Sequence, residues 1–245
     1  MNFGKDFQKY ALSEGISSLS MDFYQKQINA SITPYILEER EMRVTQMDVF
    51  SRLMRDRIIW VAGVVNDNMS TVVQAQLMYL DSVEKRDITM HIDSPGGSVK
   101  SGLSMVDVMR YINSDVATIN TGMAASMGSV LLSSGTKGKR SSLNFSKVMI
   151  HQVSSGSQGH IEDNRINQFE SEKYNYILFK MLAENSGKSF KEVLESARRD
   201  KWLNSKEALE YGFIDEVVAS DKGSSITKLM EGFDEYYQLE VLNKK

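Results

Sequence analysis

The feature of this chain that most constrains its fold is the alternation of strand-like and helix-like segments between residues 57 and 152. Short apolar, β-branched runs typical of strands lie at 57–65, 87–92, 116–121 and 147–152. Segments with apolar side chains at helical spacing follow the first three runs, at 69–85, 103–112 and 126–135. Strands that alternate with helices in this way predict a layered α/β fold with a largely parallel sheet.

The remainder of the chain is mainly helical in pattern. A long helix is predicted at 161–186 and ends at Gly187, and two short helices and a strand follow at 189–199, 205–211 and 213–218. No low-complexity linker divides the chain, so we expect a single domain over 33–218. The polar residues 1–32 are interpreted as a leader or arm that processing could remove, and 219–245 as a C-terminal tail.

The amino-acid composition argues against several classes of function. The chain has no cysteine, which excludes thiol nucleophiles, disulfides and cysteine metal ligands. Three histidines without an H-E-x-x-H motif argue against a zinc hydrolase. A net charge of −3 gives no electrostatic basis for binding nucleic acid. No apolar run is long enough for a membrane span and no secretory signal is evident, so we expect a cytoplasmic protein without a membrane partner.

The stretch NTGMAASMGSV, residues 120–130, concentrates small side chains around one hydroxyl, that of Ser126. A strand that turns sharply into a helix can present such a side chain at the edge of a sheet, as in a nucleophile elbow, although G-x-S-x-G is absent. Small neighbours let the turn close and leave room for a substrate. The same stretch also fits a close-packed helix start without chemistry.

Two further features are compatible with a nucleophilic serine. His151 follows an apolar strand-like run, where a neutral imidazole could accept the serine proton, although it could equally be a structural residue. The loop DSPGGSV carries Gly96 and Gly97, whose N–H groups could stabilise an oxyanion. That loop fits a plain turn or a phosphate-binding nest as well.

Four separated motifs resemble those of the Clp protease family of serine peptidases. They are SPGGSV, GMAASMGSVLLSSGTKGKR, VMIHQ and RRDKWLNSKEALEYGFIDEV, and the similarity extends over residues 33–218. The resemblance implies a crotonase-like α/β fold of repeated ββα units with a protruding helical handle. It also implies a serine endopeptidase, the proteolytic subunit of an ATP-dependent protease.

The resemblance assigns roles to five residues of this chain. Ser126 is expected to be the nucleophile, His151 the general base, and Asp200 the acid that orients the imidazole. The backbone N–H groups of Gly97 and Met127 are expected to form the oxyanion hole. No metal or bound cofactor is implied.

The resemblance also implies partners. It predicts a homo-oligomer of two stacked heptameric rings that enclose the active sites. An AAA+ unfoldase of the Clp type would use ATP to deliver unfolded protein substrates into that chamber.

Four positions depart from the family pattern. Thr89 and His91 replace aromatic residues at which the unfoldase docks, which puts that docking in doubt. Val153 replaces the proline of an H-Q-P motif, and Arg198 replaces an acidic residue near the expected ring–ring contact.

Two other functions remain as alternatives. A crotonase-type acyl-CoA enzyme would share the fold and the oxyanion hole but would not need Ser126, His151 and Asp200 together. A non-catalytic subunit of a mixed ring would often have lost members of that set, whereas this chain keeps all three.

Overall fold

The structure is a computed structural model that describes residues 35–40, 43–154, 156, 159–218 and 223–242. The chain divides into two compact units, Met1–Asp56 and Arg57–Lys245. The expected leader at 1–32 lies outside the described residues. In the described part of the chain, no helix is both long enough and apolar enough to cross a membrane.

The first unit contains a hairpin and a short helix. Strand β1 (Tyr35–Arg40) pairs antiparallel with β2 (Arg43–Asp48), and α3 (Val49–Arg55) follows directly. Asp48 caps this helix, because its carboxylate accepts a hydrogen bond from the N–H of Ser51 at 2.9 Å.

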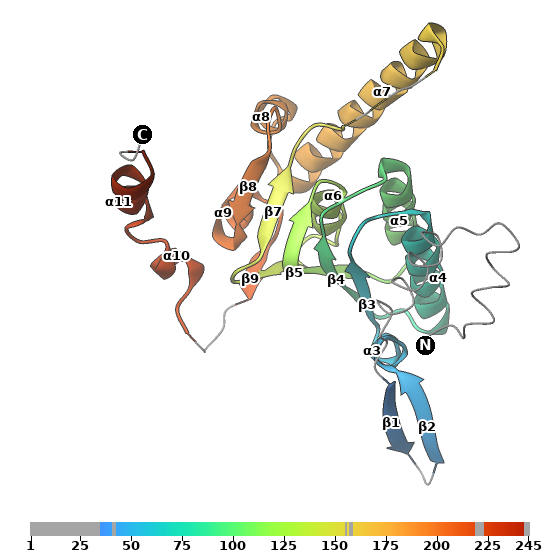
Figure 1. The fold of residues 1–245 in the computed structure, drawn as a ribbon. Coiled ribbons are helices and arrows are strands. Elements are labelled where there is room, and N and C mark those ends of the chain that lie inside the picture. Colours follow the sequence, from blue (N-terminus) through green and yellow to red (C-terminus); the bar gives the residue numbers. More distant parts are fainter. Residues whose placement is uncertain (1–34, 41–42, 155, 157–158, 219–222, 243–245) are drawn as a thin grey trace, which may run out of the picture. The chain divides into compact units, whose positions relative to one another are not determined.

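The second unit is built on a seven-stranded sheet (Figure 1). Its strands are β3 (Ile58–Ala62), β4 (Ile88–Ser94), β5 (Val116–Ala125), β6 (Arg140–Leu143), β7 (Lys147–Ile150), β8 (Lys201–Asn204) and β9 (Glu216–Val218). The order β3-β4-β5-β6-β9 is parallel throughout, while β7 pairs parallel with β5 and antiparallel with β8. The predicted, largely parallel α/β sheet is confirmed.

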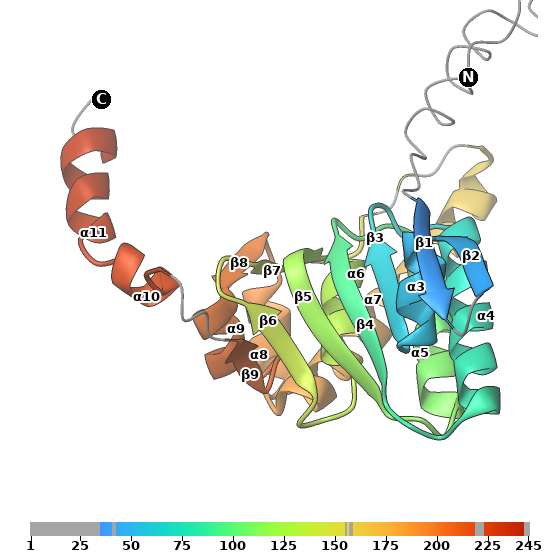
Figure 2. The ribbon, with the colours of Figure 1, turned by 90° about the horizontal axis from the view of Figure 1, so that it is seen from below.

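Helices link these strands. They are α4 (Asp67–Val83), α5 (Val99–Tyr111), α6 (Met127–Ser133), α7 (Ile161–Ser186), α8 (Phe190–Ser196) and α9 (Ser205–Tyr211), followed in the tail by α10 (Ile226–Leu229), α11 (Phe233–Tyr236) and a π-helical turn, Tyr237–Leu242. Figure 2 shows β3, β4 and β5 with α4, α5 and α6 behind them. Alternate strand residues therefore face these helices, and those of β4 (Ile88, Met90 and Ile92) are fully buried.

In the described part of the second unit, no helix covers the centre of the opposite face of the sheet (Figure 2). Its side chains alternate with the buried ones and include exposed Trp60 and Leu143 and half-buried His91. An uncovered sheet face with large apolar side chains indicates a surface that contacts another molecule.

Helix α7 projects beyond the sheet as the predicted handle (Figure 1). Its buried residues all lie in its second half: Leu178, Phe179, Met181, Leu182 and Ala183. Among the described residues the first half of the helix therefore has no buried side chain, and it carries exposed Ile161, Ile166 and Phe169.

A buried ion pair joins β6 to the segment before β9. The Arg140 side chain is 4% exposed, and its Nε and Nη2 donate to the two oxygens of Asp215 at 2.8 and 2.6 Å. Burial alone would raise the pKa of Asp215, but hydrogen bonds from the side chain and backbone of Arg140, with its charge, lower that pKa below its usual value. The carboxylate therefore stabilises the fold in its ionised form.

Asp215→Asn is expected to lower the free energy of unfolding by about 3 kcal/mol at pH 7, because the buried guanidinium loses its counter-charge. The wild-type advantage is present above the carboxyl pKa of the unfolded chain, about 4, and is lost as pH falls through the lower pKa of the folded state. Urea unfolding of both proteins across a pH series measures this difference.

Asp87→Asn is the matched control, because Asp87 pairs with Lys139 at an exposed position. Its effect is expected to stay below about 0.5 kcal/mol. Equal destabilisation by the two substitutions would contradict the role given to the buried pair.

Candidate active site

Ser126 forms the turn between β5 and α6. The strand ends at Ala125 and the helix begins at Met127, so Ser126 alone reverses the chain direction. Its φ of 54° and ψ of −119° lie in a region that non-glycine residues rarely adopt. Strain of this kind persists where surrounding structure fixes it, and here the Ser126 N–H donates to the Met149 carbonyl at 2.9 Å. The geometry is that of a nucleophile elbow.

His151 is brought to this turn by strand pairing. In the parallel register of β5 and β7, Ala125 lies opposite Met149. The predicted strand at 147–152 ends at Ile150, so His151 is the first residue beyond it. Nε2 of His151 lies 2.9 Å from Oγ of Ser126, a hydrogen-bond distance at which the imidazole can take the hydroxyl proton.

Asp200 reaches the other side of the imidazole through β8. This strand pairs antiparallel with β7 and places Lys201 opposite Ile150, so Asp200 lies beside His151. Oδ1 of Asp200 is 3.2 Å from Nδ1 of His151. The Asp200 side chain is 61% exposed and that of His151 is 25% exposed. In this contact the carboxylate favours the tautomer with its proton on Nδ1 and leaves Nε2 free to face the serine.

The glycine loop after β4 lies directly against the elbow. A Cβ atom on Gly96 would stand 2.6 Å from Cβ of Ser126 and 2.9 Å from the backbone nitrogen of Met127, so only glycine permits this approach. Gly97, with φ of 148°, approaches Val65 as closely, since a Cβ there would stand 2.3 Å from the Val65 carbonyl oxygen. The loop therefore lies against Ser126 and the first residue of α6.

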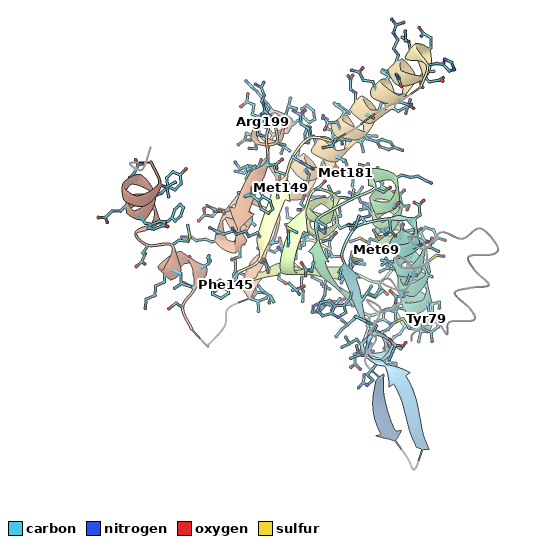
Figure 3. The ribbon with its side chains drawn as sticks, viewed as in Figure 1. Met69, Tyr79, Phe145, Met149, Met181 and Arg199 are labelled. Atoms are coloured by element: carbon cyan, nitrogen blue, oxygen red, sulfur yellow. The ribbon has the colours of Figure 1, made fainter. Side chains whose placement is uncertain are left out.

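A cavity of about 240 Å³ opens beside the Ser126 hydroxyl. Gly97 and Met127 lie on its wall together with Ser126 and His151. The remaining wall is mainly apolar and comes from α5, α6, α7, the end of β7 and the residues that follow β7. In Figure 3 the labels Met149 and Met181 mark β7 and α7. The apolar members of the wall are Val99, Val130, Ile150, Val153, Leu178, Phe179 and Leu182. Such a cavity can hold an apolar side chain next to the reactive hydroxyl.

The structure thus brings together all five residues singled out from the sequence. It adds a set that the sequence did not indicate, the α7 residues Leu178, Phe179 and Leu182 on the cavity wall. Their apolar spacing in a long helix signals burial but does not reveal which cavity they border.

The residues that depart from the family pattern lie away from the triad or at its rim. His91 stacks on Trp60 with ring centroids 4.9 Å apart, on the uncovered sheet face. Burial lowers the pKa of His91, so its ring is neutral at pH 7, and its buried Nδ1 has no hydrogen-bond partner among the described residues. Arg198 and Arg199 are exposed just beyond α8, where Figure 3 labels Arg199.

Comparison with known proteins gives a consistent result. The model of the Clp protease family matches residues 39–221. A Bacteroides fragilis protein named ATP-dependent Clp protease proteolytic subunit is 51% identical over 215 residues, which cover 87% of this chain and 98% of that protein. Proteins of the same name from Bacteroides thetaiotaomicron and Porphyromonas gingivalis are 49% and 46% identical, over 87% and 89% of this chain and 98% and 99% of their own length.

Ser126 is expected to react with a fluorophosphonate probe, because its hydroxyl alone contacts the His151 imidazole in the described part of the chain. Ser126→Ala should abolish labelling while leaving the circular dichroism spectrum unchanged, since only one oxygen is removed. Ser82→Ala, at an exposed position on α4, should label at the wild-type rate. Mass spectrometry of the labelled peptide gives the modified residue, and modification elsewhere would contradict the assignment.

Proposed function

The chain belongs to the Clp protease family, and from that membership we propose that it is the proteolytic subunit of a Clp-type protease, a serine endopeptidase for unfolded proteins and peptides. The observation that carries this proposal is the continuous contact from Ser126 through His151 to Asp200, at 2.9 and 3.2 Å. A crotonase-type acyl-CoA enzyme has no use for that contact, and a non-catalytic subunit has no need to maintain it.

In the proposed reaction, Oγ of Ser126 attacks the carbonyl carbon of the peptide bond while its proton passes to Nε2 of His151. The carbonyl oxygen becomes an oxyanion, which the N–H groups of Gly97 and Met127 stabilise. The C–N bond then breaks, and the imidazolium gives its proton to the departing amine. Water, deprotonated by His151, hydrolyses the acyl-enzyme, and Asp200 stabilises the imidazolium in both halves.

Each step draws its nucleophile, base and oxyanion donors from residues of this chain, so we propose a reaction without a bound cofactor. ATP belongs to the partner, consistent with the words "ATP-dependent" and "proteolytic subunit" in the names of the relatives. The absence of cysteine supports the proposed cytoplasmic location, because this chain gains nothing from an oxidising compartment.

The cavity beside Ser126 supports a preference for the residue that precedes the scissile bond. Its wall is mainly apolar and includes Phe179 and Leu182, which are almost fully buried. Burying a leucine-sized side chain there contributes about 2 kcal/mol relative to leaving it in water. We expect peptides with a large apolar residue at that position to be cleaved best.

The test of this function is hydrolysis of a fluorogenic peptide by the purified chain, compared with Asp200→Asn. The substitution keeps the shape of the side chain but lets the wrong imidazole tautomer form, so kcat should fall by about 10⁴. Ser126→Ala should remove hydrolysis altogether. If the wild type cleaves no peptide and the fluorophosphonate does not label it, the proposed function is wrong.

We further propose that the subunit assembles into two stacked heptameric rings. The exposed apolar residues on the projecting half of α7, among them Ile161, Ile166 and Phe169, support a contact between copies through this helix. Arg198 and Arg199 lie exposed just beyond α8, and two like charges there would repel equivalent residues of another copy across the ring–ring contact.

Sedimentation velocity across a salt series tests this assembly. Arg199→Ala should reduce both the double-ring fraction and peptide hydrolysis, because Arg199 adjoins Asp200. Arg198→Glu should instead increase the double-ring fraction at low salt, and added salt should diminish that gain. Full activity from an Arg199→Ala single ring would contradict the proposed coupling.

We propose that the uncovered sheet face around Trp60 and His91 receives the unfoldase. Thr89 and His91 offer less apolar area than the aromatic residues that they replace in the family pattern. An unfoldase from another family member should therefore activate this chain weakly. The double substitution Thr89→Tyr and His91→Tyr should raise the affinity at least tenfold, because each buried ring contributes about 1–3 kcal/mol. This affinity is measured by titrating protein degradation against unfoldase concentration. Tight binding of that unfoldase by the wild-type chain would contradict the expected weak activation.

A further inference from the structure

The main chain after His151 is held to α7 by one side-chain contact. The segment 151–154 has left the sheet, because β7 ends at Ile150. The Val153 N–H donates to Oδ1 of Asn175 at 3.0 Å, and the two residues are 22 positions apart in the chain. Among the described residues, this is the side-chain hydrogen bond that connects the main chain of 151–154 to the handle helix.

One partner of this contact lines the cavity beside Ser126, and the other lies on a helix that contributes to the cavity wall. Val153 itself lies on the wall. Asn175 lies one turn before Leu178 and Phe179, and positions three and four apart share one face of a helix. The hydrogen bond therefore ties the wall formed by 151–154 to the wall formed by α7.

We propose that Asn175 is a positioning residue that sets the width of this cavity and thereby the preference for a large apolar side chain before the scissile bond. The inference rests on the proposed peptidase function. It depends on one residue pair of this chain, because the contact needs both an acceptor at 175 and an N–H at 153. A proline at 153 would have no N–H to donate.

The contact acts on the cavity wall and not on the triad. His151 is fixed independently by Ser126 and Asp200, and Ile150 before it is fixed by pairing with β8. Losing the Asn175 contact therefore leaves the reactive hydroxyl intact but lets residues 152–154 move away from α7. A large substrate side chain that fills the cavity then loses contacts with the cavity wall, whereas an alanine side chain at the same position makes few such contacts.

The experiment compares kcat/KM for two fluorogenic peptides that differ only in leucine or alanine before the scissile bond. Asn175→Ala should lower the leucine-to-alanine ratio about two- to tenfold, the range for loss of one neutral hydrogen bond. Asn175→Asp keeps an acceptor oxygen and should retain the wild-type ratio. Val153→Pro should lower the ratio as much as Asn175→Ala, and the double variant should lower it no further.

Asn167→Ala is the matched control, an exposed asparagine two turns earlier on the same helix, and it should leave the ratio unchanged. Fluorophosphonate labelling should proceed at the wild-type rate in Asn175→Ala, Asn175→Asp and Asn167→Ala, which separates this inference from the proposed function. The proposal would be overturned if Asn175→Ala lowered kcat/KM equally for both peptides, or if the effects of Asn175→Ala and Val153→Pro on the ratio were additive in the double variant. A fall in the ratio with Asn175→Asp would also overturn it. Absence of labelling in the wild type would instead overturn the peptidase function.

Discussion

The site depends on the position of β7 between β5 and β8. The parallel register with β5 places Met149 opposite Ala125 and so fixes the Ser126 N–H on the Met149 carbonyl. The antiparallel register with β8 places Lys201 beside Ile150. A shift of one residue in either pairing would turn a side chain to the opposite face and separate the imidazole from the serine or the carboxylate. Hydrogen bonds of the backbone, and not the side chains alone, hold the triad in register.

The same arrangement explains why the site tolerates an exposed acid. Asp200 is open to water, so its attraction for His151 is weaker than that of a buried carboxylate. The orientation of the carboxylate toward His151 therefore depends on backbone geometry, and β8 fixes the backbone on the C-terminal side of Asp200. The buried pair of Arg140 and Asp215 stabilises the fold at β6 and β9, strands outside the triad.

The apolar surfaces left open by this chain are as informative as its core. The sheet face around Trp60 and the projecting half of α7 carry large side chains that nothing in the described part of the chain covers. Two exposed apolar surfaces of this kind indicate contacts with other molecules. The same helix reaches the cavity beside Ser126 through Leu178, Phe179 and Leu182, so a contact made at its outer half lies on a continuous path to that cavity.

The sequence alone predicted the layered α/β class and the long helix, because periodicity is a local property of a chain. The resemblance of its motifs to those of a known family singled out Ser126 and the four residues expected around it. The sequence pattern missed β6 and β8, four-residue strands whose polar sequences RSSL and KWLN become strands only through their neighbours. It also placed His151 inside a strand, whereas the structure places it just beyond one. Only the tertiary structure decided which distant residues meet. Asp200 and His151 lie 49 residues apart and Asn175 and Val153 lie 22 apart, and strand pairing and helix packing, which no local pattern encodes, bring each pair together.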